Sequence, residues 1–173
     1  ELELGESTLE GIKAYQKALE IDSTNEHLLY NLGLLNHFAG KIAKSKEYLK
    51  NLIQLNPEHI RSFQKLTQIY IEGKEYDEAA QTLRKLIDLE PENGIHRIEL
   101  IDLYKLACET DDNKDQLFSN YLDEFASAVK ANDQSVMAHF DYGYAILTLN
   151  SNFSLSEEEL SLSISEFKRA ISV

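Results

Sequence analysis

The sequence predicts an all-α fold built from repeated pairs of helices, and three observations support this prediction. Apolar and small residues recur at helical spacing along almost the whole chain. Only seven glycines and two prolines interrupt this pattern. The two prolines, Pro57 and Pro91, follow segments of similar outline, KIAKSKEYLKNLIQLN and EYDEAAQTLRKLIDLE. Because proline cannot continue a helix, each marks the start of a new one.

Nine helices follow from this pattern in chain order. Ser7 with Glu10 and Ser156 with Glu159 have the spacing of a capping box and mark the starts of the first and last helices. The expected ranges are 7–22, 26–39, 42–55, 58–72, 76–89, 93–109, 115–131, 135–149 and 156–172.

Shifting the sequence by the interval between the two prolines aligns small residues with small ones and large apolar residues with one another. The aligned sets include Gly11, Ser45 and Ala79; Tyr15, Leu49 and Leu83; and Ala18, Leu52 and Leu86. A small residue lets neighbouring backbones approach, and a large one fills the gap opposite. Two helices therefore alternate in each period.

The period lengthens after Pro91. Tyr121, Phe125 and Ala128 continue the face of the second helix only after about eight extra residues around ETDDNKDQ. Phe167 and Ala170 continue it once more, after the corresponding segment NSNFSLSE. The last two repeats are therefore expected to be enlarged.

This arrangement resembles the tetratricopeptide repeat family, whose helix pairs recur at intervals of about 34 residues. The unit from His59 to Pro91 carries the resemblance most clearly. Its matching positions are Leu66, Tyr70, Gly73, Tyr76, Ala79, Leu83, Leu86 and Pro91. Two later positions depart from the family pattern, with Arg97 replacing a large apolar residue and Asp133 replacing proline.

The resemblance implies a right-handed α-solenoid with about four and a half repeats. We expect a single domain over residues 1–173, with a half repeat at 1–25 and repeats at 26–59, 60–93, 94–135 and 136–173. We also expect the chain to be a piece of a longer protein with both solenoid ends uncapped, because a lone second helix begins it and Phe167, Ala170, Ile171 and Val173 continue an apolar face.

Composition argues against several classes of partner. A formal net charge of −13 repels phosphate backbones and anionic lipid surfaces, so we expect no nucleic-acid partner. No apolar run is long enough to span a bilayer. The one cysteine, Cys108, cannot form an internal disulfide and is expected to be a small buried residue. A reducing, intracellular compartment is slightly favoured.

In the resembling family, the first helix of each pair lines a concave binding side. The implied inward positions fall in four rows: His27, Tyr30, Asn31, Leu34, His37 and Phe38; then Arg61, Gln64, Lys65, Gln68, Ile71 and Glu72; then Ile95, Ile98, Glu99, Asp102 and Lys105; and then Met137, Phe140, Asp141 and Tyr144. We expect peptide binding at Tyr30, Asn31, Phe38, Arg61, Lys65, Gln68 and Phe140.

Three of these residues match half of a clamp that the family uses to hold a peptide's C-terminal carboxylate. Asn31, Arg61 and Lys65 fall on the last three clamp positions, with Lys and Arg exchanged. Two cations one helical turn apart favour a carboxylate or an acidic peptide. The alternative is that Arg61 and Lys65 are ordinary solvated helix residues.

No catalytic, cofactor or metal motif emerges from the sequence. The five histidines lack the spacing of a zinc site, and no phosphate loop or nucleophile triad is present. The first hypothesis is thus a non-catalytic protein-binding module that scaffolds a larger assembly. Two alternatives stay open, namely self-association through the uncapped ends and a regulatory arm of an enzyme whose catalytic domain lies outside this chain.

Overall fold

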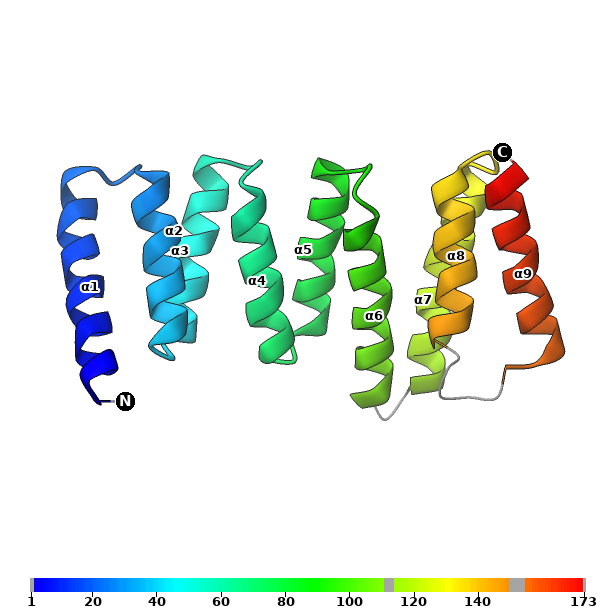
Figure 1. Ribbon diagram of the computed structural model, residues 1–173, viewed down its shortest axis with the longest axis horizontal. Coiled ribbons are helices and arrows are strands. Elements are labelled where there is room, and N and C mark those ends of the chain that lie inside the picture. The colour runs from blue at the N-terminus through cyan, green and yellow to red at the C-terminus, as the bar shows by residue number, and fades with distance from the viewer. Residues whose placement is uncertain (1, 111–113, 150–154, 173) are drawn as a thin grey trace. The chain divides into compact units, whose positions relative to one another are not determined.

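The structure is a computed structural model that describes residues 2–110, 114–149 and 155–172. These residues form nine α-helices and no strand, which confirms the all-α prediction (Figure 1). The helices are α1 (Leu2–Ile21), α2 (Glu26–Phe38), α3 (Ile42–Leu55), α4 (Ile60–Glu72), α5 (Tyr76–Leu89), α6 (Gly94–Thr110), α7 (Lys114–Ala131), α8 (Val136–Leu149) and α9 (Glu157–Ser172).

The chain divides into two compact units, Glu1–Pro91 and Glu92–Val173. In the first unit, each helix from α1 to α5 packs against the next. In the second, α6 packs against α7 and α8, and α8 packs against α7 and α9. Within each unit, consecutive helices run in opposite directions (Figure 1). The expected single domain and its repeat boundaries stay predictions.

Eight of the nine helices begin and end within two residues of their expected positions. The capping box at Ser156 is confirmed, because the Glu159 N–H donates to Ser156 Oγ over 3.2 Å and the Ser156 N–H donates to Glu159 Oε2 over 2.8 Å. The prediction that Ser7 and Glu10 begin the first helix is wrong, since α1 begins at Leu2. No proline precedes Ser7, so the backbone simply continues as a helix through it.

The aligned small and large residues of α3 and α5 lie in the core of the first unit. Leu49, Leu52, Leu83 and Leu86 are all fully buried. The helix pair α2 and α3 meets closely at Gly33, where Ser45 Oγ donates to the Gly33 carbonyl oxygen over 2.6 Å. A Cβ atom added to Gly33 would lie 2.7 Å from Leu49 Cγ, so only glycine allows this approach.

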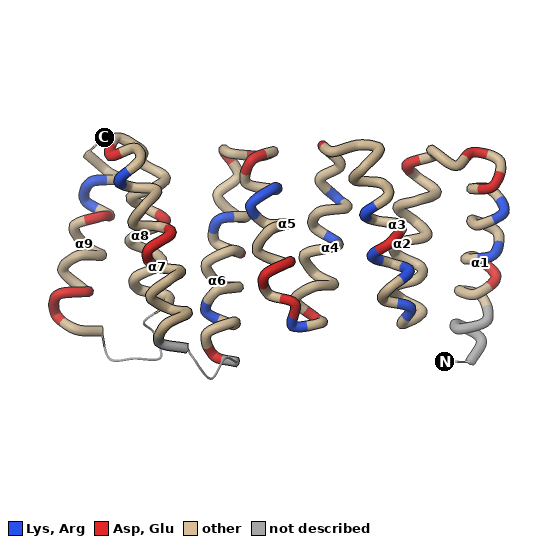
Figure 2. The backbone as a smooth tube through the Cα atoms, turned by 180° about the vertical axis from the view of Figure 1, so that it is seen from behind, with Lys and Arg blue, Asp and Glu red and all other residues tan. Residues whose placement is uncertain are grey.

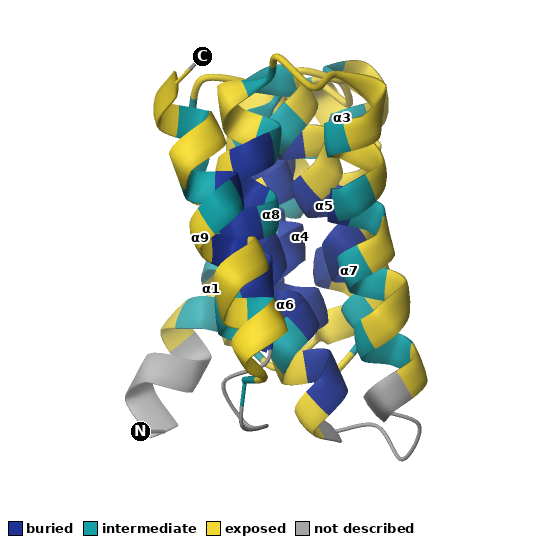
Figure 3. Cartoon of the chain, turned by 90° about the vertical axis from the view of Figure 1, so that its right-hand side faces the viewer, coloured by how far each residue is buried: buried dark blue, intermediate teal, exposed yellow. Residues whose placement is uncertain are grey.

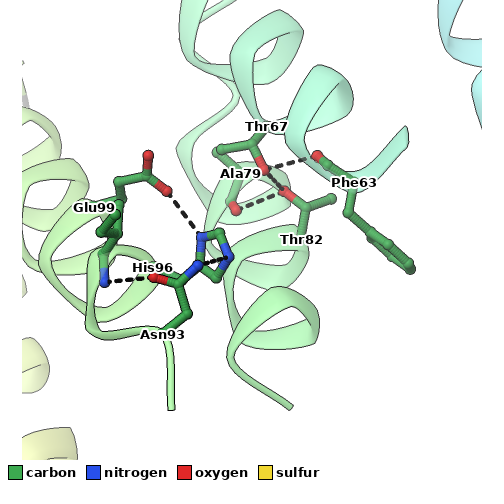
Figure 4. Close-up of polar contacts among 8 residues, drawn as sticks. Phe63, Thr67, Ala79, Thr82, Asn93, His96 and Glu99 are labelled. Atoms are coloured by element: carbon green, nitrogen blue, oxygen red, sulfur yellow. Dashed lines mark hydrogen bonds and ion pairs between the residues drawn. The ribbon is translucent and has the colours of Figure 1, made fainter. Parts of the chain in front are cut away.

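The next helix pair, α4 and α5, replaces this contact with a pair of hydroxyl groups. Thr67 stands one repeat period after Gly33, and its Oγ1 lies 2.7 Å from Thr82 Oγ1 (Figure 4). The same two hydroxyls lie within hydrogen-bond distance of the carbonyl oxygens of Phe63 and Ala79, at 3.0 Å and 2.8 Å. The buried polar atoms are therefore satisfied.

The last pair, α8 and α9, returns to the arrangement of the first. Ser163 Oγ donates to the Gly143 carbonyl oxygen over 3.0 Å, and a Cβ atom on Gly143 would lie 3.2 Å from Phe167. The contacts of this pair are thus equivalent to those of α2 and α3, with Gly143, Ser163 and Phe167 in place of Gly33, Ser45 and Leu49. The predicted register of Phe167 as the large residue of the last repeat is confirmed.

The pair α6 and α7 is built from larger residues. The rings of Tyr104 and Tyr121 are stacked with centroids 3.7 Å apart, and Tyr104 Oη donates to Glu124 Oε2 over 2.9 Å. Longer helices account for part of the predicted enlargement of this repeat. Helices α6 and α7 have 17 and 18 residues, whereas α4 and α5 have 13 and 14. The rest of both expected insertions, at 111–113 and 150–154, lies outside the described residues.

Burial in the second unit is uneven. Six residues of α8 are buried, whereas α9 buries only Ser163 and Glu166 among its residues (Figure 3). Cys108 of α6 is 7% exposed, which confirms it as a small buried residue.

Replacing Gly33 with alanine tests the close contact in α2 and α3. The added methyl group would press against Leu49, which costs more than the gain in helix propensity. We expect Gly33→Ala to lower the free energy of unfolding by about 1 to 2 kcal/mol in urea denaturation. Gly11→Ala is the control, since its Cβ would lie at an ordinary 3.7 Å from Leu35 and should stabilise by about 0.5 to 1 kcal/mol. Equal effects of the two substitutions would contradict the packing argument.

Candidate functional site

Six of the seven predicted binding residues lie in one unit, on two helices. Tyr30, Asn31 and Phe38 lie on α2, and Arg61, Lys65 and Gln68 lie on α4. We call these six residues the α2–α4 surface. The seventh residue, Phe140, lies on α8 in the other unit, so it is not assigned to the same surface.

Tyr30 and Arg61 form one end of the α2–α4 surface. The Arg61 guanidinium carbon lies 5.5 Å from the centroid of the half-buried Tyr30 ring, within cation–π range, while Arg61 itself is exposed. The His59 ring lies 5.4 Å from the Tyr30 ring and is a second contact of that ring. His59 is fixed in turn, because its Nδ1 accepts the Ser62 N–H over 3.2 Å at the start of α4.

A chain of polar contacts forms the other end of the surface. Lys65 Nζ donates to Gln68 Oε1 over 2.9 Å, and Gln68 Nε2 donates to Glu72 Oε1 over 2.8 Å. Glu72 Oε2 then lies 2.7 Å from His37 Nε2, which joins α4 to α2. The hydrogen bond from His37 lowers the pKa of the Glu72 carboxyl below its ordinary value, because it stabilises the charged form.

The expected list of site residues did not include the pair His37 and Glu72. Both occupy inward positions of the family register, and their separation in the sequence is close to one repeat period. A histidine and a carboxylate at nearly the period of the repeat are the signal in the sequence that predicts such a contact.

The remaining site residues differ in exposure. Phe38, at the end of α2, is 64% exposed, and Asn31 is half-buried. Phe140 is 41% exposed, and its ring lies 5.6 Å from the Phe167 ring of α9. Phe140 therefore contacts α9 as well as solvent.

The charge of the α2–α4 surface differs from that of the whole chain. The only charged residues of α4 other than Glu72 are the basic Arg61 and Lys65, and Figure 2 shows blue segments on this helix. Neither residue forms a salt bridge with any described residue. In a chain of net charge −13, this places on the same surface as the aromatic rings of Tyr30 and Phe38 two cations that form no salt bridge with a described residue. Such a surface suits an anionic group next to an apolar one.

The structure explains why Arg97 replaces an apolar residue in the second unit. Arg97 Nε lies 3.2 Å from Asp141 Oδ2, and both side chains are almost completely buried between α6 and α8. Asp141 is therefore a packing residue, although the family register placed it on the inward side. Burial raises the pKa of Asp141 to about 6, and Arg97 acts in the opposite direction.

A second buried pair joins α8 to α9. His139 Nδ1 lies 2.5 Å from Glu166 Oε2, and His139 Nε2 lies 2.8 Å from the carbonyl oxygen of Asp133. The carbonyl can only accept a hydrogen bond, so Nε2 donates to it, and in the protonated ring Nδ1 donates to the Glu166 carboxylate. The hydrogen bond to Glu166 raises the pKa of His139.

The described residues contain no group of three or more His, Cys, Asp or Glu side chains suited to a metal ion. None of the helices in the described ranges is long and apolar enough to cross a membrane.

The raised pKa of Asp141 predicts a pH-dependent stability. Because the folded-state pKa exceeds the ordinary value of 3.8, Asp141 stabilises the fold below about pH 4, and this contribution is lost as pH rises through about 6. We expect the free energy of unfolding of the native chain, minus that of Asp141→Asn, to fall between pH 4 and 6 in urea titrations. A difference that rises over this interval would contradict the assignment.

The pair of His139 and Glu166 predicts a second titration. Its stabilising contribution is present below the ordinary histidine pKa of 6.5 and is lost as pH rises through the raised value. NMR titration of the His139 ring should give a midpoint above 6.5 in the native chain and a lower midpoint in Glu166→Gln. Glu158→Gln, which removes an exposed carboxyl group from the same helix, should leave the midpoint unchanged.

Comparison with known proteins agrees with this geometry. A tetratricopeptide repeat model matches residues 38–100. MamA 41-end from Desulfovibrio magneticus RS-1 is 14% identical, with a TM-score of 0.55 over 96% of this chain and 85% of that chain. A double mutant of MamA RS-1 is 13% identical, with a TM-score of 0.56 over 95% of this chain and 84% of that chain.

MamA AMB-1 is also similar in fold, at 18% identity and a TM-score of 0.55 over 96% of this chain and 82% of that chain. A search of curated protein sequences finds no match. These MamA structures are tetratricopeptide repeat proteins. The chain therefore matches a tetratricopeptide repeat model over residues 38–100, and its described residues share the all-α fold of these structures.

Proposed function

We propose that this chain is a non-catalytic interaction module whose α2–α4 surface binds a peptide segment of a partner protein. Tetratricopeptide repeats stack their helix pairs so that the first helices offer an extended binding surface, and the α2–α4 surface lies on two such first helices. The observation that carries the proposal is the exposed Arg61 lying over Tyr30, with Lys65 one helical turn away.

The chemistry of these groups suits an acidic segment or a C-terminal carboxylate. A guanidinium group offers two parallel N–H donors to a carboxylate, and Lys65 adds a second charge-assisted donor. Tyr30 and the exposed Phe38 offer apolar contacts to side chains of the same peptide. Asn31, between them on α2, supplies an amide that can bind peptide backbone.

Glu72 makes the two ends of the α2–α4 surface differ in charge. It lies beyond Gln68 from Lys65, and its negative charge is held by His37. An acidic group on the ligand would be repelled at this end and attracted at the end with Arg61. We therefore expect the carboxylate of the ligand to lie at Arg61 and Lys65, with its uncharged residues toward Glu72.

By holding such a segment, the module would scaffold a larger assembly. Partners can be found by affinity capture with this chain, followed by competition with synthetic C-terminal peptides of each captured protein. Each peptide is used with a free carboxyl group and with an amidated one. We expect the free carboxyl form to compete more strongly. Equal competition would exclude recognition of the terminal carboxylate.

The double substitution Arg61→Glu plus Lys65→Glu tests the surface itself. Loss of two charge-assisted contacts and added repulsion should weaken binding of a captured peptide by about tenfold or more in isothermal titration calorimetry. Lys13→Glu plus Lys17→Glu is the matched control, because it makes the same charge change at exposed residues of α1. Circular dichroism should show unchanged helicity in both variants. If a captured peptide bound the Arg61 and Lys65 double variant as tightly as the native chain, the assignment of peptide binding to the α2–α4 surface would be wrong.

A further inference from the structure

The last helix, α9, exposes an apolar face that no other described helix covers. Leu160, Ile164 and Ile171 are 44%, 45% and 86% exposed, although each is a residue type usually found in a core. The side of α9 that packs against α8 is a different one, marked by the buried Ser163 and Glu166.

Charged residues of opposite sign lie at the two ends of this face. Glu157 lies in the first turn of α9, and Lys168 lies eleven residues later, near its end (Figure 2). Both line the same shallow surface depression as Leu160, Ser161, Ile164 and Ser165. At a rise of about 1.5 Å per residue, the two charges are separated by roughly 16 Å along the helix axis. We call Glu157, Leu160, Ser161, Ile164 and Lys168 the α9 face.

We propose that the α9 face binds the α9 face of a second copy of this chain, with the two helices antiparallel. The charge pattern is complementary to itself, as a two-fold symmetric interface requires. When the helices pair antiparallel, Glu157 lies opposite Lys168 of the partner subunit, and the reciprocal pair forms at the other end. An apolar face with one sign of charge, or with no charge, would give no such preference for a second copy.

The same register also pairs large residues with small ones. With Glu157 opposite Lys168 of the partner subunit, Ile164 lies opposite Ser161 of the partner subunit. Leu160 lies likewise opposite Ser165 of the partner subunit. Large side chains facing small ones let two helices interdigitate. Apolar packing and charge pairing therefore select one and the same antiparallel register.

The size of the surface sets the expected strength. A single pair of 16-residue helices buries less area than a standard protein interface, and the net charge of −13 on each copy opposes association. The dimer should therefore be weak and depend on concentration. We expect sedimentation equilibrium to show the mass rising from 19.8 kDa toward twice that value between about 10 µM and about 1 mM.

Charge reversal makes the test specific to the antiparallel pairing. Glu157→Lys alone and Lys168→Glu alone each place like charges opposite one another, so each should stay monomeric. The double variant Glu157→Lys plus Lys168→Glu restores both opposite pairs and should dimerise again. An equimolar mixture of the two single variants should form a mixed dimer for the same reason. Lys17→Glu on α1 is the control and should dimerise like the native chain.

Several outcomes would overturn the proposal. If the native chain stays monomeric at about 1 mM, the α9 face does not bind a second copy, and its partner is another segment or a different protein. Association that both single variants retain would place the contact elsewhere on the molecule. Failure of the double variant to regain the dimer, with helicity and thermal unfolding unchanged, would exclude the antiparallel register.

Discussion

Close contact between the backbone of one helix and a large side chain of the next holds together two of the helix pairs, α2 with α3 and α8 with α9. Gly33 admits Leu49 in the first unit, and Gly143 admits Phe167 in the second, with a serine hydroxyl bonded to the glycine carbonyl in both. Because packed interiors tolerate little change in volume, this contact fixes how the two helices of a pair lie. The position of every surface side chain on those helices follows from it.

This constraint explains how residues about one repeat apart come to share a surface. Stacking of successive pairs brings α2 beside α4, so Tyr30 meets Arg61 and His37 meets Glu72. Neither contact depends on local sequence. The packing of the pairs supplies the geometry, and the exposed side chains supply the chemistry. The helix-repeat fold therefore accounts for the shape of the α2–α4 surface, while its charge and aromatic content are particular to this chain.

Sequence pattern predicted most of the fold because the repeat signals are local. Pro57 and Pro91 set helix ends, and the alternation of small and large residues set the register. The predicted start of α1 was wrong because the spacing of Ser7 and Glu10 also occurs inside helices, where no residue ends the helix. The pairs Arg97 with Asp141 and His139 with Glu166 escaped prediction because their partners lie on different helices, and the lengthened repeats obscure their alignment. Phe140 could be placed on a helix face, but its contact with α9 needed the structure.

The central claim is that ligand binding uses α2 and α4 of the first unit. It is tested most directly by mapping amide chemical-shift changes in NMR spectra of the labelled chain as a captured peptide is added. The account predicts that the largest changes fall on residues 27–38 and 59–72, with Tyr30 and Arg61 among them. Changes centred on α3, α5 or the second unit, with α2 and α4 unaffected, would contradict it.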